Sequence, residues 1–139
     1  MIVTLPDGTR IRASSISERD DDDATRDFGL YMDERWEPTW PAEMIEWPDF
    51  ALPAFPEQAV LQIQRAYTRA RDGEAVEIGC LGGLGRTGTV LACLAVLAGV
   101  EPSGAVAWVR RNYDPAAVET AEQEMWVEWF AEHLPRQET

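Results

Sequence analysis

The sequence of 139 residues contains no lysine, one histidine and two cysteines. These residues are too few for a zinc site built from four Cys or His ligands, and they do not form the framework of a disulfide-stabilised protein. The only histidine, His133, lies near the end of the chain. Its position argues against a Ser-His-Asp triad and against an HExxH metalloprotease.

Long hydrophobic runs are absent as well. The longest apolar run, from Val90 to Val100, has eleven residues, whereas a membrane-spanning helix needs about 20. The first residues lack the basic stretch and the long apolar run of a signal peptide. With so few cysteines to form disulfides, a reducing compartment is favoured. We therefore expect a soluble, cytoplasmic protein that has no membrane partner.

Positive charge is scarce. Twelve arginines face 25 acidic residues, and the net charge is −13. A chain this acidic does not bind nucleic acid by neutralising phosphates. The acidity is concentrated at residues 18–23 and 119–139, which carry −4 and −5, whereas residues 79–111 carry +2. The exclusive use of arginine as the basic residue predicts a GC-rich bacterial genome.

Strand and helix patterns alternate along the chain. They predict one α/β domain over residues 1–139, with a central, mainly parallel sheet flanked by helices. Asp7-Gly8 predicts a hairpin, and the charged run at 18–23 predicts a solvated loop. In the last helix, Ala121, Met125 and Trp129 are expected to face inward. The other expected elements are a strand at 28–32, a proline-rich, non-helical segment at 38–56, a helix at 56–72, a strand at 75–78, and helices at 89–98, 103–112 and 120–133.

A glycine-rich loop joins the strand that ends at Ile78 to the apolar helix that begins at Thr89. The N–H groups of such a loop, together with the N-terminus of the following helix, bind phosphate. They also favour the thiolate form of a cysteine, which is then an in-line nucleophile. Cys80 opens the loop, Arg86 and Thr87 close it, and Arg86 can hold two phosphate oxygens. Between them lie the predicted phosphate-binding residues Leu81, Gly82, Gly83, Leu84 and Gly85.

Cys80 to Thr87 resembles the signature loop of the cysteine-based protein tyrosine phosphatases, in the compact dual-specificity style. Two further segments are similar to this family. Trp47-Pro48-Asp49 resembles the general-acid loop and ends 31 residues before Cys80. Val118-Glu119-Thr120-Ala121-Glu122-Gln123 resembles the segment that supplies a water-positioning glutamine. The three segments occur in the order that the family uses.

The resemblance implies a two-step hydrolysis of a phosphorylated protein or peptide, without a metal or another cofactor. Cys80 attacks the phosphorus, while Arg86 and the loop amides hold the oxygens and Thr87 hydrogen-bonds the sulfur. Asp49 protonates the leaving group and then activates the water that hydrolyses the phosphocysteine, with Gln123 orienting that water. The choice between phosphotyrosine and phosphoserine or phosphothreonine stays open. The acidic surface favours substrates with basic residues flanking the phosphate.

Gly79 departs from the family, which has a histidine before the cysteine. Because that histidine orders the loop, we expect weakened turnover, and a phosphate-binding pseudophosphatase module is the alternative. Sulfur transfer or arsenate reduction is a third possibility, although Asp49 would have no role there. Two residues have simpler interpretations: Gln123 fits the third helical position of a capping box that begins at Thr120, and Cys93 fits an apolar core.

Overall fold

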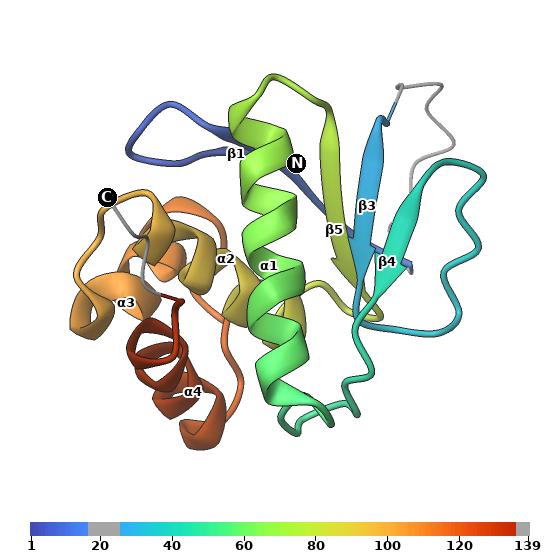
Figure 1. Ribbon diagram of the computed structural model, residues 1–139. Coiled ribbons are helices and arrows are strands. Elements are labelled where there is room, and N and C mark those ends of the chain that lie inside the picture. Colours follow the sequence, from blue (N-terminus) through green and yellow to red (C-terminus); the bar gives the residue numbers. More distant parts are fainter. Residues whose placement is uncertain (17–25, 136–139) are drawn as a thin grey trace.

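The computed structural model describes residues 1–16 and 26–135 (Figure 1). Within these two ranges, five strands form one sheet in the order β1-β2-β5-β3-β4. Only β1 runs antiparallel to its neighbour, and the other pairs are parallel. The prediction of an α/β domain with a mainly parallel sheet is therefore confirmed. The strands are β1 (Ile2–Thr4), β2 (Arg10–Ser15), β3 (Phe28–Tyr31), β4 (Ala42–Met44) and β5 (Val76–Cys80).

The predicted hairpin connects β1 to β2. Gly8 has a φ of 90°, in the left-handed region that glycine adopts without a steric penalty. Two backbone hydrogen bonds close the turn, from the Leu5 N–H to the Thr9 carbonyl and from the Gly8 N–H to the Leu5 carbonyl. The acidic run predicted to be a solvated loop, residues 18–23, lies outside the described residues.

The four helices of the described residues form one group beside the sheet (Figure 1). Helices α1 and α2 contact the strands and each other, and α3 and α4 pack against α2. Within the described ranges, no helix has both the length and the apolar character needed to cross a membrane. The helices are α1 (Pro56–Arg71), α2 (Gly85–Leu97), α3 (Pro102–Asn112) and α4 (Ala121–Glu132).

Helix α2 begins four residues before its predicted start at Thr89. Glycine lowers helix propensity, and for this reason the sequence pattern placed Gly85 to Gly88 in the loop. Arg86 and Thr87 therefore belong to the first turn of the helix. The helix is buried on all sides from Gly85 to Ala95, as its uniformly apolar composition predicted.

The side chains of β5 alternate between the two faces of the sheet. Ile78 and Cys80 belong to the hydrophobic core that also contains the buried faces of α1 and α2. Glu77 and Gly79 point to the opposite face, where the Tyr31 hydroxyl donates to a Glu77 carboxylate oxygen at 2.8 Å. The strand thus separates the helical core from a second, more polar layer.

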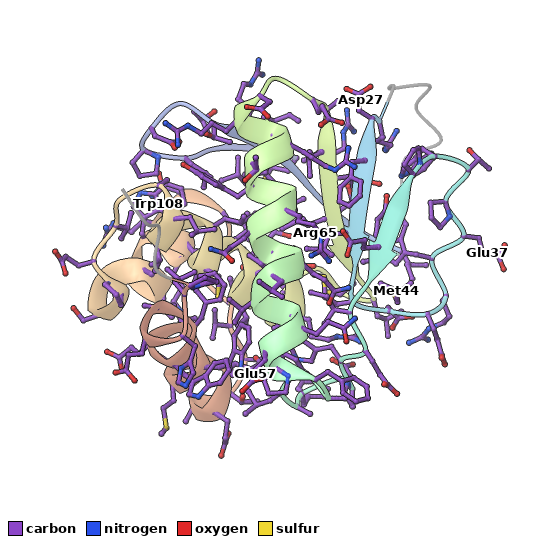
Figure 2. All side chains as sticks on the ribbon, viewed as in Figure 1. Asp27, Glu37, Met44, Glu57, Arg65 and Trp108 are labelled. Atoms are coloured by element: carbon purple, nitrogen blue, oxygen red, sulfur yellow. The ribbon has the colours of Figure 1, made fainter. Side chains whose placement is uncertain are left out.

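The proline-rich segment at 38–56 is non-helical as predicted, and it also contains the short strand β4. Arg65 lies on α1 (Figure 2). Its Nε donates to Oε2 of Glu43 on this strand at 2.9 Å. The Gln62 amide donates to the Met44 carbonyl at 3.0 Å. The hydrogen bond from Arg65 lowers the pKa of Glu43. Helix α1 therefore supports the segment that leads into residues 47–49.

The predicted inward face of α4 is wrong. Met125 is 68% exposed, Ala121 is exposed and Trp129 is half-buried. The buried stripe lies about 150° around the helix axis from the predicted one. It joins two aromatic residues, a valine and an N-terminal capping side chain at i, i+3, i+4 and i+7. Its members are Gln123, Trp126, Val127 and Phe130.

Candidate active site

Cys80 lies at the carboxyl end of β5 and is 2% exposed. Its sulfur accepts two hydrogen bonds, from the Gly83 N–H at 3.2 Å and from the Thr87 hydroxyl at 2.9 Å. Two donors on one sulfur stabilise negative charge there. The five residues that separate Cys80 from Arg86 therefore fold back over the thiol, as the predicted phosphate-binding loop requires.

Two features shape the backbone of the loop and its junction with α2. Gly83 has a φ of 76°, and its carbonyl accepts a hydrogen bond from the Tyr113 hydroxyl at 2.5 Å. The N-cap of α2 is Leu84, whose side chain makes no capping hydrogen bond. Because most helices satisfy their first N–H groups with a polar N-cap side chain, an apolar residue here leaves those groups to bind an anion.

Arg86 is buried, with 4% of its side chain exposed. Its Nη1 donates to the carbonyls of Met32 at 2.7 Å and Trp47 at 2.9 Å, and its Nη2 donates to Asp33 at 3.2 Å. Its Nε is buried and has no hydrogen-bond partner among the described residues. Asp49 Oδ1 lies 3.6 Å from Nε, beyond hydrogen-bond distance. One edge of the guanidinium is therefore fixed and Nε remains as a donor.

Asp33 links Arg86 to the surface. Its carboxylate also accepts from Nε and Nη2 of Arg35, at 2.9 and 2.8 Å. The hydrogen bonds from Arg35, reinforced by Arg86, lower the pKa of Asp33 from 3.8 to about 2. Asp33 is therefore ionised at neutral pH and balances the buried charge of Arg86.

The loop that carries Asp49 is anchored on both sides of that residue. Trp47 is buried, its indole N–H donates to the Ala51 carbonyl at 2.8 Å, and its ring lies 5.5 Å from that of Trp126. The Asp49 side chain is 43% exposed and accepts a hydrogen bond from the Phe50 N–H at 3.1 Å. The buried tryptophan fixes the loop, and the carboxylate extends from it toward Arg86.

Gln123 is fully buried and its amide has backbone partners. Oε1 accepts from the N–H groups of Glu119 and Thr120 at 2.9 and 3.3 Å, and Nε2 donates to the Ala51 carbonyl at 3.3 Å. The Thr120 hydroxyl completes the capping box. These contacts show that Gln123 caps α4 and also supports the loop that carries Asp49. Its role in orienting water stays a prediction.

A depression of about 490 Å³ opens between residues 32–35 and 44–49. Both Asp49 and Arg86 line it, and Cys80 does not. Its lining carries more negative than positive charge, because four carboxylates accompany two guanidinium groups. These residues are Asp33, Glu34, Glu46, Asp49, Arg35 and Arg86.

Asp33 and Trp36 were not identified from the sequence. Asp33 follows β3, which pairs with β5 in parallel, and the carboxyl ends of parallel strands meet at one edge of a sheet. An acidic residue directly after the predicted strand at 28–32 could therefore have indicated that Asp33 lies near the loop that follows β5. Trp36, whose indole N–H donates to the Cys80 carbonyl at 3.3 Å, had no signal except the unusual glycine at position 79.

A family model described as "PTP-SAK: Swiss Army Knife protein, DSP-PTPase phosphatase domain" matches residues 53–127. The chain belongs to this family, and its resemblance to the cysteine-based protein tyrosine phosphatases is confirmed. The matched range contains the loop from Cys80 to Thr87 and also Gln123. It begins four residues after Asp49.

The chain is similar to two uncharacterized proteins of the archaeon Methanocaldococcus jannaschii. One is 38% identical over 109 residues, which cover 70% of this chain and 71% of the relative. The other is 36% identical over 109 residues, which cover 70% and 66%. Both relatives are archaeal, so the comparisons do not support the expected bacterial origin; arginine usage reports the base composition of a genome and not its lineage.

The fold is also similar to solved phosphatase structures. The crystal structure of Tk-PTP in the active form is 30% identical, has a TM-score of 0.66, and is matched over 77% of this chain and 79% of that chain. Human DUSP28 is 12% identical with a TM-score of 0.68, over 95% and 96% of the two chains. The second likeness concerns the fold alone.

Proposed function

We propose that this protein hydrolyses phosphate monoesters on proteins or peptides through a phosphocysteine at Cys80. The observation that carries this proposal is the arrangement of Arg86, whose guanidinium is fixed by two carbonyls and Asp33. Its buried Nε lies 3.6 Å from Asp49 Oδ1 and has no hydrogen-bond partner among the residues described. Buried N–H donors are rarely left without an acceptor. A phosphate oxygen is a suitable acceptor, because it carries the opposite charge.

In the first step, the Cys80 sulfur forms a bond to phosphorus and the bond from phosphorus to the leaving oxygen breaks. Asp49 gives its proton to that oxygen, and the loop N–H groups and Arg86 hold the other three oxygens. In the second step, Asp49 takes a proton from water, which attacks phosphorus and releases the Cys80 thiolate and inorganic phosphate. Thr87, 2.9 Å from the sulfur, stabilises the thiolate in both steps.

The charges around the depression favour substrates with basic residues beside the phosphate. Glu34, Glu46 and Asp49 line the depression together with one surface arginine, Arg35. An acidic rim attracts arginine or lysine side chains and repels acidic ones, and salt screens this effect. At low salt, phosphotyrosine peptides flanked by arginine should have a higher kcat/KM than peptides flanked by glutamate. Equal values for the two peptides would contradict this part of the proposal.

The test of the reaction is hydrolysis of p-nitrophenyl phosphate by the full chain. Cys80→Ser should abolish turnover, and Cys93→Ser is its control, because Cys93 is a buried thiol in the core of α2. Asp49→Asn should lower kcat by roughly 10²- to 10⁴-fold, the usual contribution of a general acid. Glu46→Gln removes a neighbouring carboxylate from the same depression and should leave kcat within about twofold.

The pseudophosphatase alternative is favoured by one observation, the glycine at position 79. The alternative predicts that vanadate or a phosphopeptide binds to the wild-type protein without turnover, and that Arg86→Met abolishes this binding. Unchanged hydrolysis in Cys80→Ser would contradict the proposed reaction. Binding without hydrolysis in the wild-type protein would replace it with the phosphate-binding module.

A further inference from the structure

Trp36 packs against the backbone of β5 on the face of the sheet that Gly79 and Glu77 share. A Cβ atom at position 79 would lie 2.5 Å from Cζ2 and 2.9 Å from Cε2 of the indole ring. Contacts this short do not occur in folded proteins, since they lie well inside van der Waals separation. The position before the nucleophile is therefore a glycine because the indole fills the space that a side chain would take.

The indole ring is fixed in place by its surroundings. Trp36 is 3% exposed and stacks on Tyr31, with ring centroids 4.4 Å apart and an angle of 16° between the planes. The Tyr31 hydroxyl donates to Glu77 at 2.8 Å. The backbone N–H of Trp36 donates to the Asp33 carbonyl at 3.2 Å. A ring held this way can act as a rigid hydrogen-bond donor.

That donor reaches the first peptide of the phosphate-binding loop. Trp36 Nε1 donates to the Cys80 carbonyl at 3.3 Å, and the Ile16 N–H donates to the same oxygen at 3.2 Å. The C=O and N–H of one trans peptide point in opposite directions, so fixing the Cys80 carbonyl also fixes the N–H of Leu81. Donation to the carbonyl polarises the peptide and makes this N–H a stronger donor.

We infer that Trp36 is a positioning residue for Cys80, acting through the peptide that joins Cys80 to Leu81. The inference rests on the proposed function, in which this loop binds phosphate and Cys80 reacts as a thiolate. A strengthened, correctly directed N–H at the start of the loop stabilises negative charge on the thiolate and on the phosphate oxygens. The indole thus contributes to the chemistry from the face of the sheet opposite the helices.

The experiment compares Trp36→Phe with Trp40→Phe in the full chain. The first change keeps an aromatic ring and removes the N–H to Cys80. The second makes the same chemical change at a tryptophan whose Nε1 donates to the Tyr31 hydroxyl at 2.9 Å. Neither change alters the charged groups around the loop and behind β5. Among the described residues, those groups are Arg26, Asp33, Asp49, Glu77, Arg86 and Glu119.

The main readout is the rate of Cys80 alkylation by iodoacetamide from pH 4 to pH 9, with each thiol followed separately by mass spectrometry. One neutral hydrogen bond changes an equilibrium constant by roughly fivefold. This bond is made with both the thiol and the thiolate, and only the difference between them moves the midpoint. We expect the pH midpoint to rise by up to about 0.7 in Trp36→Phe, and to stay within about 0.2 of wild type in Trp40→Phe. A lowered melting temperature without a change in the midpoint would mean a purely structural role and would overturn the inference.

Gly79→Ala provides a second, independent variant. Its Cβ displaces the indole, so the midpoint should rise by the same amount as in Trp36→Phe. In the double variant the two shifts should not add, because both remove the same hydrogen bond. Additive shifts would overturn the inference.

The kinetics separate this inference from the proposed function. If the wild-type protein does not hydrolyse p-nitrophenyl phosphate and the midpoint still rises in Trp36→Phe but not in Trp40→Phe, the positioning role is supported and the proposed reaction is refuted. Where wild type is active, kcat/KM at pH 6 should fall by up to roughly fivefold in Trp36→Phe and remain unchanged in Trp40→Phe. Equal midpoints and equal kinetics in folded Trp36→Phe and wild type would overturn the inference while leaving the reaction intact.

Discussion

Replacing Asp33 by asparagine tests the charge balance under the candidate active site. The carboxylate accepts hydrogen bonds from the N–H, Nε and Nη2 of Arg35 and from Nη2 of Arg86. Asparagine has the same shape but carries one oxygen fewer and no charge. Its amide NH₂ would face a guanidinium, so that two donors oppose each other and the buried Arg86 loses its counter-ion.

The magnitude follows from the pKa of Asp33, which hydrogen bonds from Arg35 and then from Arg86 lower from 3.8 to about 2. One pKa unit corresponds to about 1.4 kcal/mol, so the ionised carboxylate stabilises the fold by about 2 kcal/mol, allowing for screening at Arg35, which is 59% exposed. A lowered folded-state pKa gives a contribution that is complete above pH 3.8 and disappears as the pH falls through about 2. The loss in Asp33→Asn should therefore be constant from pH 5 to pH 8.

The assay is urea-induced unfolding of wild type and Asp33→Asn at pH 5, 6.5 and 8. Glu34→Gln is the control, since it removes the neighbouring carboxylate, which is exposed; its free energy of unfolding should stay within about 0.5 kcal/mol of wild type. Vanadate binding should also weaken in Asp33→Asn, because Arg86 is no longer held on both sides. A loss below 0.5 kcal/mol, or one that changes steadily between pH 5 and pH 8, would refute this account of Asp33.

Three further predictions concern the loop and its supports. Gly83→Ala should lower the free energy of unfolding by about 1–2 kcal/mol and weaken vanadate binding, because its φ of 76° strains any residue with a Cβ. Gln123→Leu should cost about 2 kcal/mol by urea unfolding, since it leaves the backbone N–H groups of Glu119 and Thr120 without an acceptor, whereas Met125→Ala, at an exposed position, should cost less than 0.5 kcal/mol. Cys93 should resist iodoacetamide in the native protein at pH 8 while Cys80 reacts, because burial raises the pKa of the Cys93 thiol; comparable labelling of both thiols would contradict this.

The sequence predicts helices and strands correctly where the pattern that defines them lies within the element itself. The apolar face of α1 and its Pro56 start were predictable, since a helix stripe and a proline at the first helical position are sequence features. The start of α2 was not, because Gly85 and Gly88 lower helix propensity, and tertiary packing overrides that preference here. The inward face of α4 was also misjudged: two stripes of similar apolarity compete in the sequence, and only the position of the neighbouring helices selects one.

In the candidate active site too, contacts within one segment were predictable from the sequence and contacts between distant segments were not. The sequence predicted that Cys80 and Thr87 lie close together, because the short glycine-rich segment between them folds into one tight loop. The contacts of Arg86 with Met32 and Trp47 join residues 54 and 39 positions apart, and no local pattern encodes such distances. Asp33 is brought beside Arg86 by the parallel pairing of β3 with β5.

The sequence alone determined the class of the protein and the position of the loop from Cys80 to Thr87, because their information lies in consecutive residues whose geometry the backbone itself restricts. The tertiary structure decided how the loop is supported. It showed that Gly79 is matched by an indole from residue 36, and that the buried guanidinium is balanced by Asp33. These features depend on steric fit and charge pairing between segments far apart in the chain, and such contacts exist only once the sheet has formed.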